Sequence, residues 1–419
     1  KSDGTLSHNK LVGEGLIPKT DSWAYLLNWA REKARRSPTV MIFENTSMAK
    51  LADEARGYGL HVIGNGSFCH KLEEKRLWGF KVAEEAGATL PPYEAFSTIT
   101  DAMKFAGTLG DTATFWKTDQ YLDADSTHGA SNGEEMVAYL AGVRVAYGDR
   151  MSCIIQKKME GVPISTARWW NGRSWSGPWT GDIEHKKAWN DELGPSTGCS
   201  FDAVWFYDDE PAIAKALGWD GLAEQFVKYE APPGIYDMNA IAGEDGNAYF
   251  LEWTPRFGWD CTVTSFELLK GELGKFFWSL VTGTANGPDV TSELAYSIRL
   301  GVPPYPWEHW SPMQGDKHMF KAMPLYSLDL DDDKFIPYQL SRDDEIGLSI
   351  GSPDGLLGLA VGKGRRLSAI HDDLVEWIQD HKSGIPGLSA RTDGAKVVAK
   401  DAKAINDVGA FTVPEGLTK

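Results

Sequence analysis

Two acidic residues, Asp237 and Glu252, lie in neighbouring segments whose composition favours β-strands. Segment 234–240 reads Gly-Ile-Tyr-Asp-Met-Asn-Ala, and segment 250–258 reads Phe-Leu-Glu-Trp-Thr-Pro-Arg-Phe-Gly. The turn between them, 243–246, contains an Asp-Gly pair, which is a strong hairpin signal. We therefore predict a β-hairpin that holds the two carboxylates near the same level of its arms. Carboxylates this close need a cation between them, or one of them must take a proton.

The chemistry of this acidic pair favours a magnesium ion. Hard oxygen ligands on a rigid strand ladder suit Mg²⁺, which commonly bridges to nucleotide phosphates. The alternative is an exposed hairpin on which the two acids are incidental, because acidic side chains are common on exposed strands. These residues by themselves leave both interpretations open.

A second candidate group combines a basic triplet with a segment of turn-forming residues. Its members are His185, Lys186, Lys187, Pro195, Ser196 and Thr197. Segment 194–198 reads Gly-Pro-Ser-Thr-Gly, which predicts a turn. Side-chain cations and turn amides together can capture an anion. The alternative is an exposed loop that carries solvated lysines.

The elements that must position these groups begin with alternating strands and helices. The sequence predicts a strand at 39–43, a helix at 47–57 and a strand at 60–63. This β-α-β order implies a parallel sheet with a right-handed crossover. A further helix is predicted at 71–86, with Gly87 as its stop.

A compact unit is predicted at about 112–160. It contains a strand at 114–117, a polar loop at 123–130, a helix at 134–145 and a strand at 153–157. The loop is rich in small residues, so its backbone amides could approach phosphates. A simple surface turn is the alternative that these residues leave open.

Tryptophans crowd the region of short strands and turns that is predicted at 162–205. They are Trp169, Trp170, Trp175, Trp179 and Trp189. Such a cluster either stacks on a ring-bearing substrate or forms a packed core. Helices are predicted at 211–229 and, beyond the acidic hairpin, at 265–282.

Composition limits the classes of function. The 419 residues carry a net charge of −17, which argues against a nucleic-acid partner bound through a broad basic face. The length predicts about two to four domains. The sequence has no run of about 18 apolar residues and no signal-peptide pattern, so we expect a cytoplasmic protein without a membrane partner. The four cysteines form no Cys-x-x-Cys pair, which fits a reducing compartment and no structural zinc.

As a set, these residues resemble the ATP-grasp ligases, and specifically the phosphoribosylamine–glycine ligase (glycinamide ribonucleotide synthetase) family. That family carries Asp-His-Lys-Arg, then Gly-Pro-Asn-Thr-Gly-Gly, then Glu-Phe-Asn-x-Arg-Phe-Gly. The corresponding segments here are 184–187, 194–199 and 252–258. The resemblance extends from about Val40 to Gly394.

The resemblance implies an ATP-grasp fold that combines α/β and α+β parts. Residues 1–70 would form a partial Rossmann-like N-terminal domain, because the family's glycine-rich loop is not found after Lys1 and is expected to precede it. Residues 71–292 would form the ATP-grasp domain, with a small lid lobe at about 112–160. Residues 293–419 would form a C-terminal α+β domain.

The chemistry that the resemblance implies is ATP-dependent joining of a carboxylate to an amine through an acyl phosphate. Lys75 and Lys117 would hold the nucleotide phosphates under a lid formed by loop 123–130. The residues expected to contact the nucleotide are Lys75, Lys117, His128, Gly129, Gln156, Lys157 and Met159.

The same resemblance assigns the metal and acceptor sites. Asp237, Glu252 and Thr254 would bind Mg²⁺, with Mn²⁺ as an alternative. Arg256 would grip an anionic substrate group or a phosphate and would act in catalysis together with Lys186. The acceptor site would be lined by His185, Lys186, Lys187, Pro195, Ser196, Thr197 and Arg256.

The sequence departs from the family in ways that affect the substrate site more than the nucleotide site. Thr254 replaces the family's metal-binding asparagine, and its hydroxyl is a weaker ligand. Segment 198–201 reads Gly-Cys-Ser-Phe in place of Gly-Gly-Met-Gly, and segment 259–261 reads Trp-Asp-Cys in place of Asp-Pro-Glu. His128 stands where the family has a lysine or a glycine.

Three functions remain open at this stage. The first is a ligase of purine biosynthesis. The second is a related ligase, virus-encoded or from a secondary pathway, that joins an amino acid or amine to another acceptor such as a modified nucleotide. The third is a non-catalytic nucleotide-binding relative. The expected partners are small carboxylates and amines, and the expected assembly is a monomer or homodimer.

Overall fold

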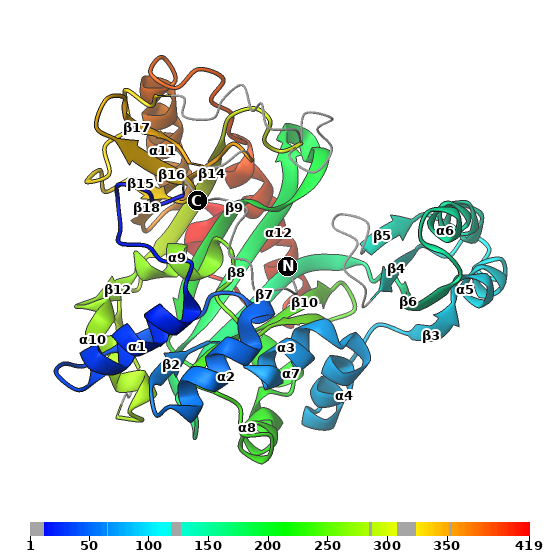
Figure 1. Ribbon diagram of the computed structural model, residues 1–419. Coiled ribbons are helices and arrows are strands. Elements are labelled where there is room, and N and C mark those ends of the chain that lie inside the picture. The colour runs from blue at the N-terminus through cyan, green and yellow to red at the C-terminus, as the bar shows by residue number, and fades with distance from the viewer. Residues whose placement is uncertain (1–11, 65, 119–126, 285–286, 308–323, 352–353) are drawn as a thin grey trace.

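The computed structural model describes residues 12–64, 66–118, 127–284, 287–307, 324–351 and 354–419. Figure 1 shows a large body built on one long sheet, with a small lobe that projects from one side. No helix in these ranges is long and apolar enough to cross a membrane.

The N-terminal segment confirms the predicted β-α-β order. Its elements are α1 (Trp23–Ala34), β1 (Val40–Ile42), the 3₁₀ turn Thr46–Met48, α2 (Ala49–Gly57) and β2 (His61–Ile63). Strands β1 and β2 pair in parallel, with Val40 opposite His61. The predicted helix at 71–86 is wrong as a single element, because the chain breaks at Lys75 into two helices, α3 (Ser67–Glu74) and α4 (Arg76–Ala86). Helix α4 stops at the predicted Gly87, which has a left-handed conformation.

The small lobe is a four-stranded antiparallel sheet covered by two helices (Figure 1). Its elements are β3 (Tyr93–Thr98), α5 (Ile99–Ala106), β4 (Thr114–Thr118), β5 (Thr127–Ala130), α6 (Gly133–Tyr147) and β6 (Arg150–Lys157). The strand order is β3-β6-β4-β5, so the lobe starts at Tyr93 rather than near residue 112. Trp116, Met136 and Leu140 lie in its own buried core.

The large body is organised by an eight-stranded antiparallel sheet in the order β11-β10-β7-β8-β9-β14-β18-β15. The strands are β7 (Gly161–Trp170), β8 (Trp175–Trp189), β9 (Leu193–Tyr207), β10 (Gly234–Gly243), β11 (Ala248–Thr254), β14 (Leu294–Gly301), β15 (Phe335–Pro337) and β18 (Leu356–Gly364). Because β14 pairs with β9, the strands β14, β15 and β18 continue this sheet, whereas β16 and β17 pair with each other in a separate two-stranded sheet.

Helices and short strands surround this sheet. They are α7 (Ala212–Ala216), α8 (Trp219–Lys228), α9 (Cys261–Phe266), β12 (Leu269–Lys270), α10 (Leu273–Val281), β13 (Asp289–Val290), β16 (Leu340–Asp343), β17 (Gly347–Ile350), α11 (Leu367–His381), α12 (Gly394–Val408) and the 3₁₀ turn Glu415–Thr418. The helices predicted at 211–229 and 265–282 are therefore each two shorter helices. Gly218, which has a positive φ of 74°, separates α7 from α8.

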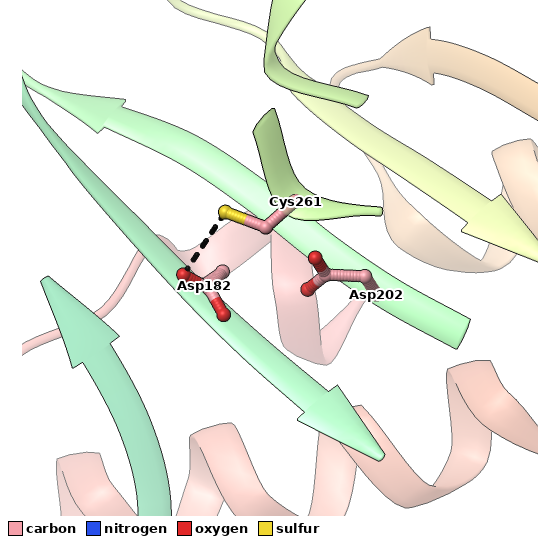
Figure 2. A group of neighbouring side chains, drawn as sticks. All are labelled: Asp182, Asp202 and Cys261. Atoms are coloured by element: carbon pink, nitrogen blue, oxygen red, sulfur yellow. Dashed lines mark hydrogen bonds between the residues drawn. The ribbon is translucent and has the colours of Figure 1, made fainter. Parts of the chain in front are cut away.

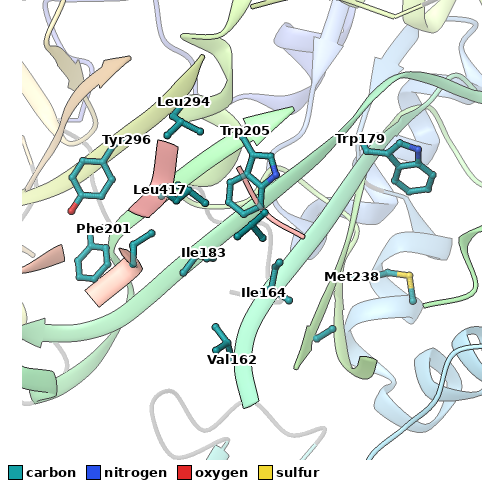
Figure 3. Close-up of a cluster of buried hydrophobic side chains, with 14 of the residues drawn as sticks. Val162, Ile164, Trp179, Ile183, Phe201, Trp205, Met238, Leu294, Tyr296 and Leu417 are labelled. Atoms are coloured by element: carbon teal, nitrogen blue, oxygen red, sulfur yellow. The ribbon is translucent and has the colours of Figure 1, made fainter. Parts of the chain in front are cut away.

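The two faces of the long sheet differ in chemistry. One face carries apolar side chains, including Ile183, Phe201 and Met238, and belongs to the largest buried core (Figure 3). Successive strand residues point to opposite faces, so Asp182, Asp202 and Asp237 lie on the other face. Helix α9 packs on that polar face against β8, β9 and β14. The polar face is where the candidate site lies.

Candidate active site

The acidic hairpin is present, with a register that differs from the predicted one. Asp237 pairs with Thr254, and Asn239 pairs with Glu252. The two carboxylates therefore belong to neighbouring cross-strand pairs on one face and do not lie directly opposite each other. All four side chains share the polar face, because Met238 and its partner Trp253 lie in the apolar core.

Asn239 is a site residue that the sequence analysis missed. Its Nδ2 donates to Thr254 Oγ1 at 3.0 Å and to Asp237 Oδ2 at 3.3 Å. The signal was available, since Asn239 lies two residues after Asp237 and must therefore point to the same face of the strand. A carboxamide consequently stands beside Thr254, supplied by the opposite arm of the hairpin.

Three cations from distant parts of the chain gather at Glu252. Arg76 Nη1, at the start of α4, lies 3.4 Å from Glu252 Oε2. The charges of Lys117, Arg76 and Lys186 overcome the effect of burial and lower the pKa of Glu252 to about 2. The small lobe contributes Lys117, and β8 contributes Lys186. Lys186 also lies 3.4 Å from Glu184, so three cations face two carboxylates here, which leaves positive charge for a further anion.

Lys117 is buried on the central strand β4 of the small lobe. Burial lowers its pKa to about 8, and the nearby charge of Glu252 partly opposes that shift. The lysine that is predicted to bind nucleotide therefore lies near Glu252 of the acidic hairpin. Lys75, in contrast, is exposed at the break between α3 and α4, and Arg76 is the residue that reaches Glu252.

The basic triplet does not form one pocket, because strand alternation divides it between the two faces of β8. Lys186 lies on the polar face, with Nζ 3.4 Å from Glu184 Oε1, and the Glu184 charge raises the pKa of Lys186. His185 points to the opposite face, where its Nε2 lies 2.8 Å from Asp401 Oδ2 on α12. Lys187 shares that face and donates to the Gly194 carbonyl at 3.4 Å.

The predicted turn at 194–198 is wrong. Those residues belong to β9, and the hairpin turn that joins β8 to β9 is the 3₁₀ segment Asn190–Glu192. Ser196 pairs with Lys187, and Pro195 is half-buried beside it. Thr197 Oγ1 lies 2.9 Å from the Lys186 carbonyl oxygen. The ladder is irregular on both sides of the pair of Ser196 with Lys187, and Gly194 has a positive φ of 81°, so the segment is an irregular part of the strand.

Arg256 follows directly after β11 and is engaged by Glu73 on α3. Its Nε and Nη2 each lie 2.9 Å from Glu73 Oε1, and Nη1 donates to the Phe257 carbonyl at 3.0 Å. To grip a substrate anion, the guanidinium would have to exchange this carboxylate for the ligand.

The remaining predicted nucleotide residues lie in the small lobe or in its connection to β7. Gln156 is buried on β6, and its Nε2 has no hydrogen-bond partner among the described residues. Lys157 is exposed, and Met159 is half-buried in the connection that follows. His128 on β5 stacks on Tyr139 with a centroid distance of 3.6 Å.

The lid prediction falls partly outside the described residues. Gly129 pairs with Phe115, and a Cβ at Gly129 would lie 2.8 Å from Phe115 Cε1, so a larger residue here would have to displace the Phe115 ring. Residues 123–126 of the predicted loop are not among those described.

The hairpin donors fit a hard cation. Asp237 is buried, and its Oδ1 has no hydrogen-bond partner in the described part of the chain. Burial and the neighbouring Asp182 charge raise the pKa of Asp237 well above its usual value, which a bound cation would reverse. Glu252 and Thr254 supply further oxygens on the same face.

Most of the clustered tryptophans are core residues. Trp169, Trp170 and Trp179 are buried, as the packed-core alternative predicts. Trp175 and Trp179 line a surface cavity of about 340 Å³ together with Trp219. This cavity adjoins the apolar face of the sheet, away from Glu252, because Trp179 and Trp219 belong to the main core.

No protein-family model matches the sequence, and no curated protein sequence matches it. Solved structures do match. Phosphoribosylamine–glycine ligase from Thermotoga maritima superposes with a TM-score of 0.66 at 15% identity, over 87% of this chain and 88% of that one. The biotin carboxylase domain of Hydrogenobacter thermophilus 2-oxoglutarate carboxylase, solved with MgADP and bicarbonate, gives 0.57 at 13% identity, over 94% and 84%.

A third match is carboxyaminoimidazole ribonucleotide synthase from Aspergillus clavatus, solved with ATP. It gives a TM-score of 0.53 at 11% identity, over 84% of this chain and 85% of that one. At these identities the likeness concerns the fold. The predicted fold class is thus confirmed: the chain has the ATP-grasp fold shared by phosphoribosylamine–glycine ligase and related nucleotide-dependent enzymes.

Proposed function

We propose that this protein is an ATP- and Mg²⁺-dependent ligase that joins a carboxylate to an amine through an acyl phosphate. The observation that carries the proposal is the meeting of Lys117, Arg76 and Lys186 around Glu252 on the metal hairpin. Phosphoryl transfer needs cations fixed around the moving group more than it needs covalent help from the protein. The fold brings these cations together from three separate segments.

Each residue would have a distinct task. Mg²⁺, when bound, would neutralise phosphate oxygens, and Asp237, Glu252 and Thr254 would hold it. Lys117 would remain mostly protonated at pH 7, because its pKa is about 8, and would bind a phosphate oxygen of ATP. Arg76 would hold Glu252 in place. The resembled family carries an asparagine at the position of Thr254. Here Asn239 would supply that amide from the opposite arm of the hairpin, which favours a working site over a non-catalytic relative.

The purine-pathway ligase is the first candidate for the specific reaction, and a related ligase with another acceptor is the second. The second is favoured by the region around β8 and β9. His185 is bound to Asp401, and Lys187 lies on the face away from the site. An acceptor site built from the whole basic triplet is therefore incomplete in this chain. In either case we expect a cytoplasmic enzyme with small-molecule substrates.

The test is ADP release measured with glycine and phosphoribosylamine, and then with a panel of other acids and amines. ADP formation that requires both an acid and an amine would support a ligase. ADP formation with the purine pair would select the first candidate, and formation with a different pair would select the second. Tight ATP binding without turnover on any pair would contradict the proposal.

A further inference from the structure

A second cluster of metal-ligating side chains lies on the polar face, outside the hairpin. Asp182 on β8, Asp202 on β9 and Cys261 at the start of α9 each offer a ligand atom within 4.8 Å of the others, and all three residues are buried. Figure 2 shows the two carboxylates and the thiol facing one another. Cys261 Sγ lies 3.3 Å from Asp182 Oδ1.

Asp202 is the unusual member of this cluster. Its side chain is 0% exposed, and neither carboxylate oxygen has a hydrogen-bond partner among the described residues. A buried carboxylate without a partner is costly, and native structures rarely leave one unsatisfied. Figure 2 shows this carboxylate directed towards Asp182 and Cys261, which points to a missing ligand between them.

The surrounding charges do not supply the missing partner. Arg299 forms a buried two-point ion pair with Asp260, at 3.0 Å and 2.6 Å. Lys186 is held by Glu184. Ser165 bonds to Asp182 and does not reach Asp202 in the hydrogen bonds found among the described residues. The cluster therefore concentrates negative charge that only a cation or extra protons can offset.

We propose that Asp182, Asp202 and Cys261 bind a divalent transition-metal ion of the Zn²⁺ type, separate from the Mg²⁺ of the hairpin. A thiolate among the donors selects against Mg²⁺ and Ca²⁺ and suits zinc, which accepts cysteine sulfur and carboxylate oxygen. With zinc bonds of about 2.0–2.3 Å, the donors of a tetrahedral site lie about 3.5 Å apart. The donor atoms here lie within 4.8 Å of one another, so each distance between two donors would shorten by roughly 1.3 Å at most on binding.

Binding releases to solvent the Cys261 thiol proton and any proton that the two carboxyl groups hold, and it leaves a thiolate on the metal. The ion ties α9 to β8 and β9, and so fixes the segment that joins α9 to Arg256 and the hairpin. Cys261 comes five residues after Arg256, and its sulfur is buried, so the ion would fix the position of α9 next to the candidate site. The sequence predicts no structural zinc because it has no Cys-x-x-Cys pair. This site instead uses one cysteine and two distant carboxylates.

The experiment uses the full chain expressed in medium supplemented with Co²⁺, which replaces Zn²⁺ and reports a sulfur ligand by a thiolate-to-cobalt absorption band in the near ultraviolet. We expect about one ion per chain by elemental analysis, together with that band. Cys261→Ser should lose both, and Asp202→Asn should lose the ion. The matched control is Cys199→Ser, which removes another buried cysteine of the same region and should keep both.

The wild-type measurement alone can overturn the proposal, even if a variant fails to fold. Folded wild-type protein with only trace metal and no absorption band would mean that protons, and not a metal ion, offset the negative charge of the carboxyl cluster. Cys261→Ser that keeps the band would place the ion elsewhere. Neither readout depends on ATP turnover, so a failure here is distinct from a failure of the proposed ligase activity.

Discussion

Replacing Lys117 by methionine is expected to stabilise the protein at pH 7 and to weaken ATP binding. In the fold, burial lowers the Lys117 pKa from 10.5 to about 8. The folded state therefore binds its proton less tightly than the unfolded chain does. Multiplying this shift of roughly 2.5 by about 1.4 kcal/mol gives a cost of roughly 3.5 kcal/mol at pH 7, as an upper estimate.

The sign of the pH dependence follows from the same shift. Between pH 8 and pH 10.5 the unfolded chain holds more protons at this site than the folded one, so wild-type stability gains from Lys117 as the pH rises through that window. The advantage of Lys117→Met in urea denaturation should therefore shrink between pH 7 and pH 10. The exposed Lys104 of α5, replaced by methionine, is the matched control and should show no such change.

ATP binding by the wild type should weaken as the pH rises, whereas its stability should increase. If the nucleotide needs protonated Lys117, the dissociation constant measured by calorimetry should rise about tenfold from pH 7 to pH 9, because the protonated fraction falls from about 0.9 to about 0.1 around a pKa of about 8. Lys117→Met should bind weakly at every pH, without this slope. The reasoning is refuted if Lys117→Met binds ATP as the wild type does, or if it is destabilised at pH 7.

Three further perturbations test the rest of the site. Glu252→Gln should lower turnover by about 10²-fold or more while the fold persists, whereas the same change at the exposed turn residue Glu244 should have no effect; equal activity in the two variants would remove Glu252 from the metal site. Lys186→Ala should raise the acceptor KM and leave the ATP KM nearly unchanged; the reverse pattern would assign Lys186 to the nucleotide. Arg299→Met should destabilise the protein by about 3–5 kcal/mol in urea denaturation, because it leaves the Asp260 charge buried and without its ion-pair partner; a change below about 1 kcal/mol would show that this ion pair does not stabilise the fold.

Local patterns in the sequence were sufficient for the hairpin and for the first β-α-β unit. The Asp-Gly turn and flanking β-forming residues predicted β10 and β11, and Gly87 predicted the end of α4. These features depend on residues close together in the chain, where turn chemistry and capping act directly.

The errors arose where tertiary pairing overrides local preference. Segment 194–198 has turn-forming residues, yet it lies within the fifteen-residue strand β9, where Ser196 pairs with Lys187 of β8. The resemblance predicts one acceptor site from the whole basic triplet, whereas alternation along β8 directs His185 and Lys186 to opposite faces. The ion pair between Arg76 and Glu252 joins residues that are 176 positions apart, and no short motif predicts it.

The most direct test of the ligase proposal follows oxygen atoms. The enzyme is given ATP, an amine and a carboxylic acid labelled with ¹⁸O in its carboxylate, beginning with glycine and continuing through the acids that support ADP release. An acyl phosphate passes one carboxylate oxygen to the departing phosphate, so the account predicts ¹⁸O in the inorganic phosphate. Unlabelled phosphate formed together with amide product would contradict it.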